Sequence, residues 1–122
     1  AVGLGARADQ LAGALAHGER RQLELGLALA TGARILLLDE PMAGMGPEEA
    51  ARILSLLEAL KRRRTILLVE HDMVAVFRLA DRISTLVYGR VIASGAPDEI
   101  RRHPEVRRAY LGEAYLDGEG PA

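Results

Sequence analysis

Two acidic residues, Asp39 and Glu40, directly follow the aliphatic run of residues 35–38. A strand that ends in two acids can hold a Mg²⁺ ion with one carboxylate and a water molecule with the other. Nucleotide hydrolysis needs both functions, a bound cation and an oriented attacking water. The alternative is a core strand whose acidic end is merely solvated. The two acids by themselves leave both interpretations open.

A histidine, His71, stands in a similar place, after the aliphatic run of residues 65–69. An imidazole that directly follows a buried strand can donate a hydrogen bond to a terminal phosphate and sense whether that phosphate is present. The alternative is an ordinary loop histidine without a ligand.

A small, glycine-containing segment, residues 15–19, lies just before a predicted helix. The free N–H groups and the positive end of the helix dipole make such a place suitable for a phosphate. The alternative is a simple helix start in which Gly18 is the N-cap and His17 lies at the surface.

The elements around these residues alternate between helix and strand. Helices are predicted over residues 19–31, from Pro47 to the basic residues 61–64, and over residues 73–80. The two aliphatic runs between them predict strands that are buried on both faces. This order is typical of a parallel α/β sheet, in which ligands bind outside the carboxyl ends of the strands.

The last third of the chain changes to a β-hairpin followed by short helices. A type II′ turn at Gly89 and Arg90 suits the hairpin because glycine takes the first central position. The predicted segments are strands over residues 82–88 and 91–94, a helix over 97–102, a further turn or two over 104–110 and a loose tail over 117–122.

The composition argues against several functions. The formal net charge is −1 and aromatic residues make up 3% of the chain, so neither a basic surface nor a base-stacking platform for nucleic acid is expected. Cysteine is absent, which excludes disulfides and thiolate metal sites. No apolar run approaches the ~18 residues of a membrane-spanning helix. Any association with a membrane would therefore come through a partner subunit.

In this order, the motifs together resemble those of ABC transporter ATPases. Residues 15–19 look like the signature motif, usually written LSGGQ, and residues 35–40 look like the Walker B strand with its catalytic glutamate. Residues 41–47 correspond to the D-loop region and His71 to the switch histidine. The resemblance covers residues 10–112. The strings PMAGMGP, VEHDM and AYLG are similar to ATPases of branched-chain amino-acid and urea uptake systems.

The resemblance implies a fold and a role for each of these residues. The fold would be a partial P-loop NTPase (ABC ATPase) α/β fold, a mostly parallel sheet flanked by helices with a C-terminal β-hairpin. Asp39 would serve a Mg²⁺ ion, usually through water, Glu40 would be the general base, and His71 would contact the γ-phosphate of ATP. The residues expected to meet the nucleotide held by a second subunit are Ala16, His17, Gly18 and Glu19, together with Gly44 and Gly46 of the D-loop.

The resemblance also implies partners. In this family two ATPase subunits enclose ATP head-to-tail, as a homo- or heterodimer, and work with transmembrane permease subunits and, indirectly, a solute-binding protein. The parent protein would be cytoplasmic, peripheral on the inner face of the plasma membrane, and would energise import of a small solute such as branched-chain amino acids. The alternatives are a non-transport ABC-type ATPase and a non-catalytic interaction module. Residues 1–18 would form the end of a helical subdomain with the signature loop, 19–112 the ATPase core and 113–122 a tail.

The chain departs from the family pattern at several positions. Ala16 replaces a serine whose hydroxyl contacts the γ-phosphate, Gly46 replaces a frequent aspartate, and Glu19 replaces a common glutamine. The chain contains no G-x-x-x-x-G-K-[ST] loop, because its single lysine, Lys61, has no glycine loop before it. The simplest explanation for the missing loop is that the sequence is an N-terminally truncated fragment. Such a fragment is expected to lack ATPase activity and to leave apolar sheet surfaces uncovered.

Overall fold

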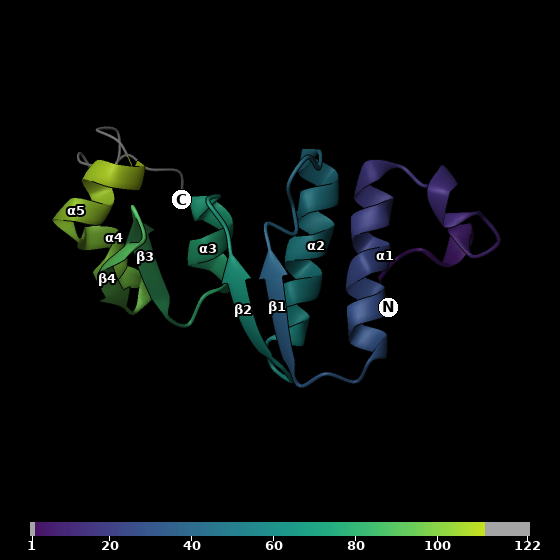
Figure 1. The fold of residues 1–122 in the computed structure, drawn as a ribbon, viewed down its shortest axis with the longest axis horizontal. Helices are drawn as coiled ribbons and strands as arrows, with labels where there is room; N and C mark the ends of the chain where they lie inside the picture. The colour runs from purple at the N-terminus through teal and green to yellow at the C-terminus, as the bar shows by residue number, and fades with distance from the viewer. Residues whose placement is uncertain (1, 112–122) are drawn as a thin grey trace. The chain divides into compact units, whose positions relative to one another are not determined.

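The computed structural model describes residues 2–111 (Figure 1). The helices are α1 (His17–Ala30), α2 (Pro47–Leu60), α3 (Met73–Leu79), α4 (Pro97–Arg102) and α5 (Pro104–Val106), and the strands are β1 (Ile35–Asp39), β2 (Thr65–Val69), β3 (Ile83–Val87) and β4 (Arg90–Gly95). Short 3₁₀ turns occupy Gly5–Arg7 and Ala12–Ala14, and a π-helical turn occupies Arg107–Leu111. The predicted tail over residues 113–122 lies outside the described residues. Within residues 2–111, no helix has the length and apolarity needed to cross a membrane.

The chain divides into two compact units, one that ends at His71 and one that begins at Asp72. The first unit contains α1, β1, α2 and β2, and the second contains α3, the β3–β4 hairpin, α4 and α5. The predicted alternation of helices and strands is therefore confirmed.

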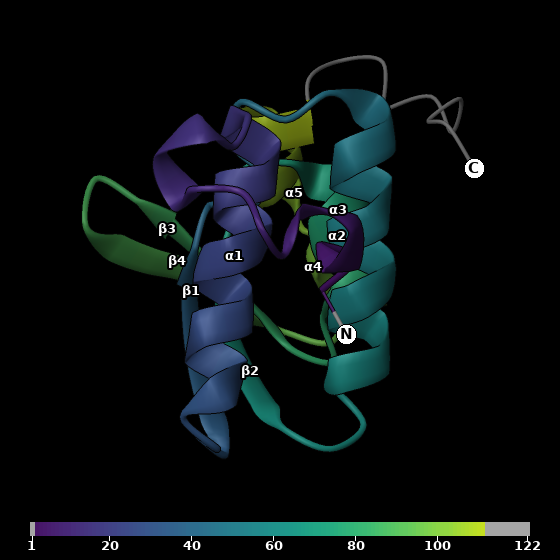
Figure 2. The same cartoon turned by 90° about the vertical axis from the view of Figure 1, so that its right-hand side faces the viewer.

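The first unit is built on a parallel pair of strands. β1 and β2 pair in register from Ile35 opposite Thr65 to Asp39 opposite Val69, and α2 makes the crossover between them. Figures 1 and 2 show α1 and α2 on the same side of this pair. The side chains buried in this unit include Leu25 of α1, Leu36 of β1 and Ile53, Leu54 and Leu57 of α2.

The other face of the strand pair is exposed. Side chains alternate between the two faces of a strand, and the outward set consists of Ile35, Leu37, Leu67 and Val69, with exposed fractions of 62%, 73%, 61% and 56%. We call these four residues the open apolar face. The aliphatic runs predicted strands buried on both faces, whereas in the described chain helices cover one face only.

The start of α2 is specified by local sequence. Pro47 takes the first helical position, where its missing N–H costs no helical hydrogen bond. The N-cap is Gly46, whose N–H donates to Oε2 of Glu49 at 3.3 Å. This is the backbone half of a capping box, in which the acid at the third helical position binds the N-cap amide.

The second unit packs the hairpin against the C-terminal helices. Ile83 of β3, Ile100 of α4 and Val106 of α5 form its buried core, with Phe77 of α3 against it. The Arg101 guanidinium lies 4.6 Å from the centre of the Phe77 ring, within reach of a cation–π contact.

The hairpin turn differs from the predicted one. β3 ends at Val87 and β4 begins at Arg90, and these two residues pair with each other. The two turn residues are therefore Tyr88 and Gly89 rather than Gly89 and Arg90. Both have positive φ, 47° for Tyr88 and 75° for Gly89. Two positive values are the mark of a type I′ turn, whose twist matches that of the flanking strands. The type II′ prediction was therefore wrong because it misplaced the register by one residue.

Candidate functional site

Glu40 and His71 meet where β1 and β2 end. The Nδ1 atom of His71 lies 2.8 Å from Oε1 of Glu40, within hydrogen-bonding distance. The Glu40 N–H donates to the Val69 carbonyl at 2.8 Å, which extends the strand ladder by one step. The side chains of Glu40 and His71 are 44% and 74% exposed, so a ligand can reach them. The parallel pairing thus brings the two strand ends together.

The backbone of Glu40 takes a left-handed conformation, with φ of 44°. A residue with a side chain pays about 1–3 kcal/mol for such a conformation, which persists only where the surroundings enforce it. Here the Glu40 N–H is held by Val69, and its carbonyl accepts from the Ala43 N–H at 3.0 Å. This turn ends the strand and directs the chain into the loop of residues 41–46.

Asp39 is the last residue of β1 and is exposed. Because side chains alternate along a strand, it lies on the same face as Ile35 and Leu37, the open apolar face. Among residues 2–111, no three metal-ligating side chains come together. A single carboxylate still suits Mg²⁺, which keeps several waters and takes its remaining ligands from substrate phosphates.

In the predicted phosphate-facing segment, residues 15–19, Ala16 is the N-cap of α1 and the helix itself starts at His17. Its Glu19 carboxylate is engaged within the same chain, since Oε2 accepts from the Ala16 N–H at 3.0 Å and Oε1 from Arg7 Nε at 3.0 Å. The Ala16 hydrogen bond, with help from the Arg7 charge, lowers the pKa of Glu19 from its ordinary value, against the raising effect of desolvation. Glu19 therefore caps its own helix.

The start of α1 also lies against the loop of residues 41–46. The Nε2 atom of His17 is 3.2 Å from the Ala43 carbonyl oxygen. A Cβ atom on Gly44 would come within 3.0 Å of the same Nε2, and one on Gly18 within 2.5 Å of the Glu49 carboxylate. The structure thus joins the predicted signature segment to Gly44. From the sequence, Glu49 is expected only as an acid that opens the helix at Pro47. Its contact with Gly18 was not predicted, nor was its cap on Gly46, although a position three residues after Gly46 is the spacing of a capping box.

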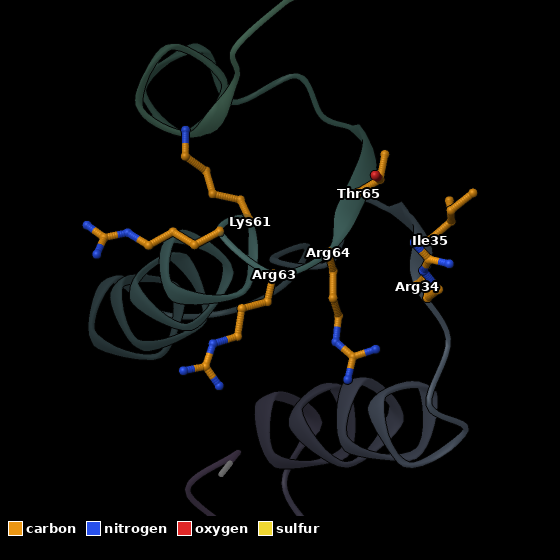
Figure 3. A pocket seen from close by; sticks show the side chains of 7 residues that line it. Arg34, Ile35, Lys61, Arg63, Arg64 and Thr65 are labelled. Atoms are coloured by element: carbon orange, nitrogen blue, oxygen red, sulfur yellow. The ribbon is translucent and has the colours of Figure 1, made fainter.

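A pocket of about 530 Å³ lies at the opposite ends of the two strands. Its lining consists of Arg34, Ile35, Lys61, Arg62, Arg63, Arg64 and Thr65. The Lys61 side chain points away from those of Arg63 and Arg64 (Figure 3), and Arg64 donates to the Ala33 carbonyl. Five strand residues span about 16 Å, so this basic pocket is separate from the Glu40–His71 pair.

Comparisons with known proteins agree with this geometry. The profile of the family described as "Branched-chain amino acid ATP-binding cassette transporter" matches residues 90–116. The chain is 44% identical over 115 residues to the high-affinity branched-chain amino acid transport ATP-binding protein LivG of Salmonella typhimurium, covering 93% of this chain and 45% of LivG. It is 43% identical over 109 residues to the corresponding protein BraF of Pseudomonas aeruginosa, covering 88% of this chain and 43% of BraF.

A solved structure shows the same fold. The ADP conformation of MJ1267, an ATP-binding cassette of an ABC transporter, matches with a TM-score of 0.76 and 31% identity over 92% of this chain and 46% of that one. The chain thus spans less than half the length of the relatives it matches. The predicted ABC ATPase α/β fold is confirmed. These matches support the C-terminal part of the ATP-binding subunits of branched-chain amino-acid ABC transporters as what this chain resembles.

Proposed function

We propose that the complete protein containing this chain hydrolyses ATP to energise import of a small solute, branched-chain amino acids first among them. The observation that carries the proposal is the Glu40–His71 pair at 2.8 Å, exposed at the carboxyl ends of two parallel strands. Ligands of open α/β sheets bind outside these ends. The names of LivG and BraF supply the solute class.

Glu40 is proposed as the general base that takes a proton from the attacking water. One of its carboxylate oxygens accepts from His71 Nδ1 in this structure, which leaves the second oxygen for water. His71 is proposed as the residue that contacts the γ-phosphate of ATP. His71 would in this way have two roles, to orient Glu40 and to detect the γ-phosphate.

Asp39 is proposed as the Mg²⁺ residue, through a water ligand. When bound, the ion would neutralise charge that develops on the transferring phosphoryl group. The position of Asp39, directly before Glu40 in the chain, places its carboxylate at the same strand end as the base. ATP itself requires a phosphate-binding loop, and the chain has no G-x-x-x-x-G-K-[ST] sequence. We therefore expect no turnover from these 122 residues alone.

The first turn of α1 is proposed to face the nucleotide of a second ATPase subunit. Its N–H groups lack partners within the helix and carry the positive end of the dipole. The proposed contacts are Ala16, His17, Gly18 and Glu19, with Gly44 and Gly46 from the neighbouring loop. We retain residues 1–18, 19–112 and 113–122 as the divisions of the chain. Permease subunits would hold the complete protein at the inner face of the plasma membrane, and a solute-binding protein would act indirectly.

The test uses the complete protein assembled with its permease partners. Glu40→Gln removes the proposed base but keeps the shape of the side chain, so ATP turnover should fall about 10²–10⁴-fold while ATP binding persists. The matched control is Glu105→Gln, an exposed acid of α5, which should leave turnover unchanged. Equal turnover in the wild type and Glu40→Gln would refute the catalytic role. Uptake of labelled leucine that follows ATPase activity across the variants would support transport over a non-transport ATPase.

A further inference from the structure

The side chain of His17 is turned toward its own chain. Its Nε2 atom lies 3.2 Å from the Ala43 carbonyl oxygen. Because a carbonyl oxygen can only accept, Nε2 must carry the proton and donate. Gly44, with φ of 73°, leaves room for the ring, since a Cβ there would lie 3.0 Å from Nε2. The imidazole thus contacts two consecutive residues of the loop of residues 41–46.

The contacted residue is itself hydrogen-bonded to the proposed base. The Ala43 N–H donates to the Glu40 carbonyl at 3.0 Å, and the Glu40 carboxylate binds His71 at 2.8 Å. These bonds form an unbroken series from His17 at the start of α1 to His71 after β2. Each bond lies within the first compact unit.

A second contact holds the same two segments together. The Glu49 carboxylate lies directly over buried Gly18, where a Cβ would come within 2.5 Å of it, and accepts from the Gly46 N–H. The start of α1 therefore contacts the loop of residues 41–46 directly through His17, and is linked to Gly46 indirectly through the Glu49 carboxylate.

We propose that His17 is a positioning residue, which fixes the loop of residues 41–46 and through it the backbone of Glu40. The proposal rests on the proposed function, in which α1 faces one nucleotide and Glu40 serves another. The His17 side chain then works within its own subunit, and the nucleotide of the second subunit is left to the amides of the α1 first turn. A loop fixed at Ala43 keeps the proposed base in place while the signature helix engages its ligand.

The first experiment does not depend on catalysis. Amide hydrogen exchange is measured across residues 41–46 in the complete protein, without nucleotide, for the wild type, His17→Ala and His17→Gln. Loss of one hydrogen bond should speed exchange of this loop about 2- to 10-fold in His17→Ala. His17→Gln, whose side-chain amide can donate to the Ala43 carbonyl, should restore much of the protection. Wild-type exchange rates in His17→Ala would overturn the proposal.

The second experiment measures ATP turnover in the same variants. A misplaced base lowers kcat, whereas ATP binding through the phosphate-binding loop is untouched, so His17→Ala should lower kcat about 10-fold with little change in KM. His17→Gln should recover most of kcat. A rise in KM with unchanged kcat would instead assign the ring to nucleotide binding and overturn the positioning role. If the wild type has no turnover, the proposed function fails, and the hydrogen-exchange result still decides the role of His17 in the loop.

Discussion

Replacing Gly18 with alanine would place a methyl group where the Glu49 carboxylate now lies. The Cβ of an alanine at position 18 would lie 2.5 Å from the Glu49 Cδ and Oε2 atoms, closer than a Cβ atom approaches non-bonded atoms in proteins. The atoms in the way belong to the end of a flexible side chain, so Glu49 would move aside rather than the backbone. The move would break its hydrogen bond to the Gly46 N–H, which caps α2.

Two opposing contributions set the size of the effect. Loss of the cap interaction costs about 1–2 kcal/mol. Alanine gains up to about 1 kcal/mol over glycine within a helix, and less in its first turn. Gly18→Ala alone should therefore destabilise the protein by up to about 2 kcal/mol. Once Glu49→Ala has removed the obstructing carboxylate, the same change at Gly18 should become neutral or stabilising.

The assay is a double-mutant cycle measured by urea unfolding of the complete protein, with midpoints compared at matched m-values. We expect a coupling free energy of about 1–2 kcal/mol between Gly18 and Glu49. Glu48→Ala serves as the matched control, because Glu48 lies in the same first turn of α2 but is exposed, and it should show no coupling to Gly18. Coupling to Glu49 below about 0.5 kcal/mol would refute the steric argument.

Three further predictions concern the core, the helix cap and the open apolar face. Leu57→Ala should lower the free energy of unfolding by about 2–5 kcal/mol in urea melts, because Leu57 is 0% exposed. Leu27→Ala is the control, because Leu27 is 61% exposed and its loss should change the free energy of unfolding little. Equal effects of the two substitutions would contradict the packing described. The lowered pKa of Glu19 means that its carboxylate stabilises the fold above pH 4.5, its ordinary pKa, and that this contribution is lost as pH falls through the lower folded-state pKa. The stability gap between the wild type and Glu19→Gln should therefore narrow below pH 4.5, and a gap that widens on acidification would be inconsistent with this cap. The double substitution Leu37→Gln and Leu67→Gln should reduce self-association of the 122-residue chain, measured by sedimentation velocity, because the two side chains are 73% and 61% exposed. Unchanged association would exclude the open apolar face as the surface through which the chain self-associates.

The elements that follow from local pattern were predictable. Continuous aliphatic runs define β1 and β2, and Pro47 marks the start of α2, because these signals depend only on neighbours in the sequence. The meeting of Glu40 and His71 was also predictable, since parallel strands place their carboxyl ends at one edge.

Contacts that depend on register or tertiary packing were not predictable. The hairpin turn could be assigned to Gly89–Arg90 as easily as to Tyr88–Gly89, because the pairing of Val87 with Arg90 decides between them. The hydrogen bond from His17 to the Ala43 carbonyl joins residues 26 positions apart in the sequence. Its acceptor is a backbone carbonyl, which every residue type has, so the sequence does not indicate it. The roles proposed for Asp39 and the other site residues stay predictions.

The left-handed backbone at Glu40 has a consequence for protein engineering. Glycine adopts this conformation without steric cost, so Glu40→Gly should relieve part of the backbone strain while removing the carboxylate. A variant library screened for heat resistance alone would therefore tend to discard the acid at this position. Thermostability design on this protein should hold residue 40 constant, because the proposed base and the residue best suited to this backbone conformation are different amino acids.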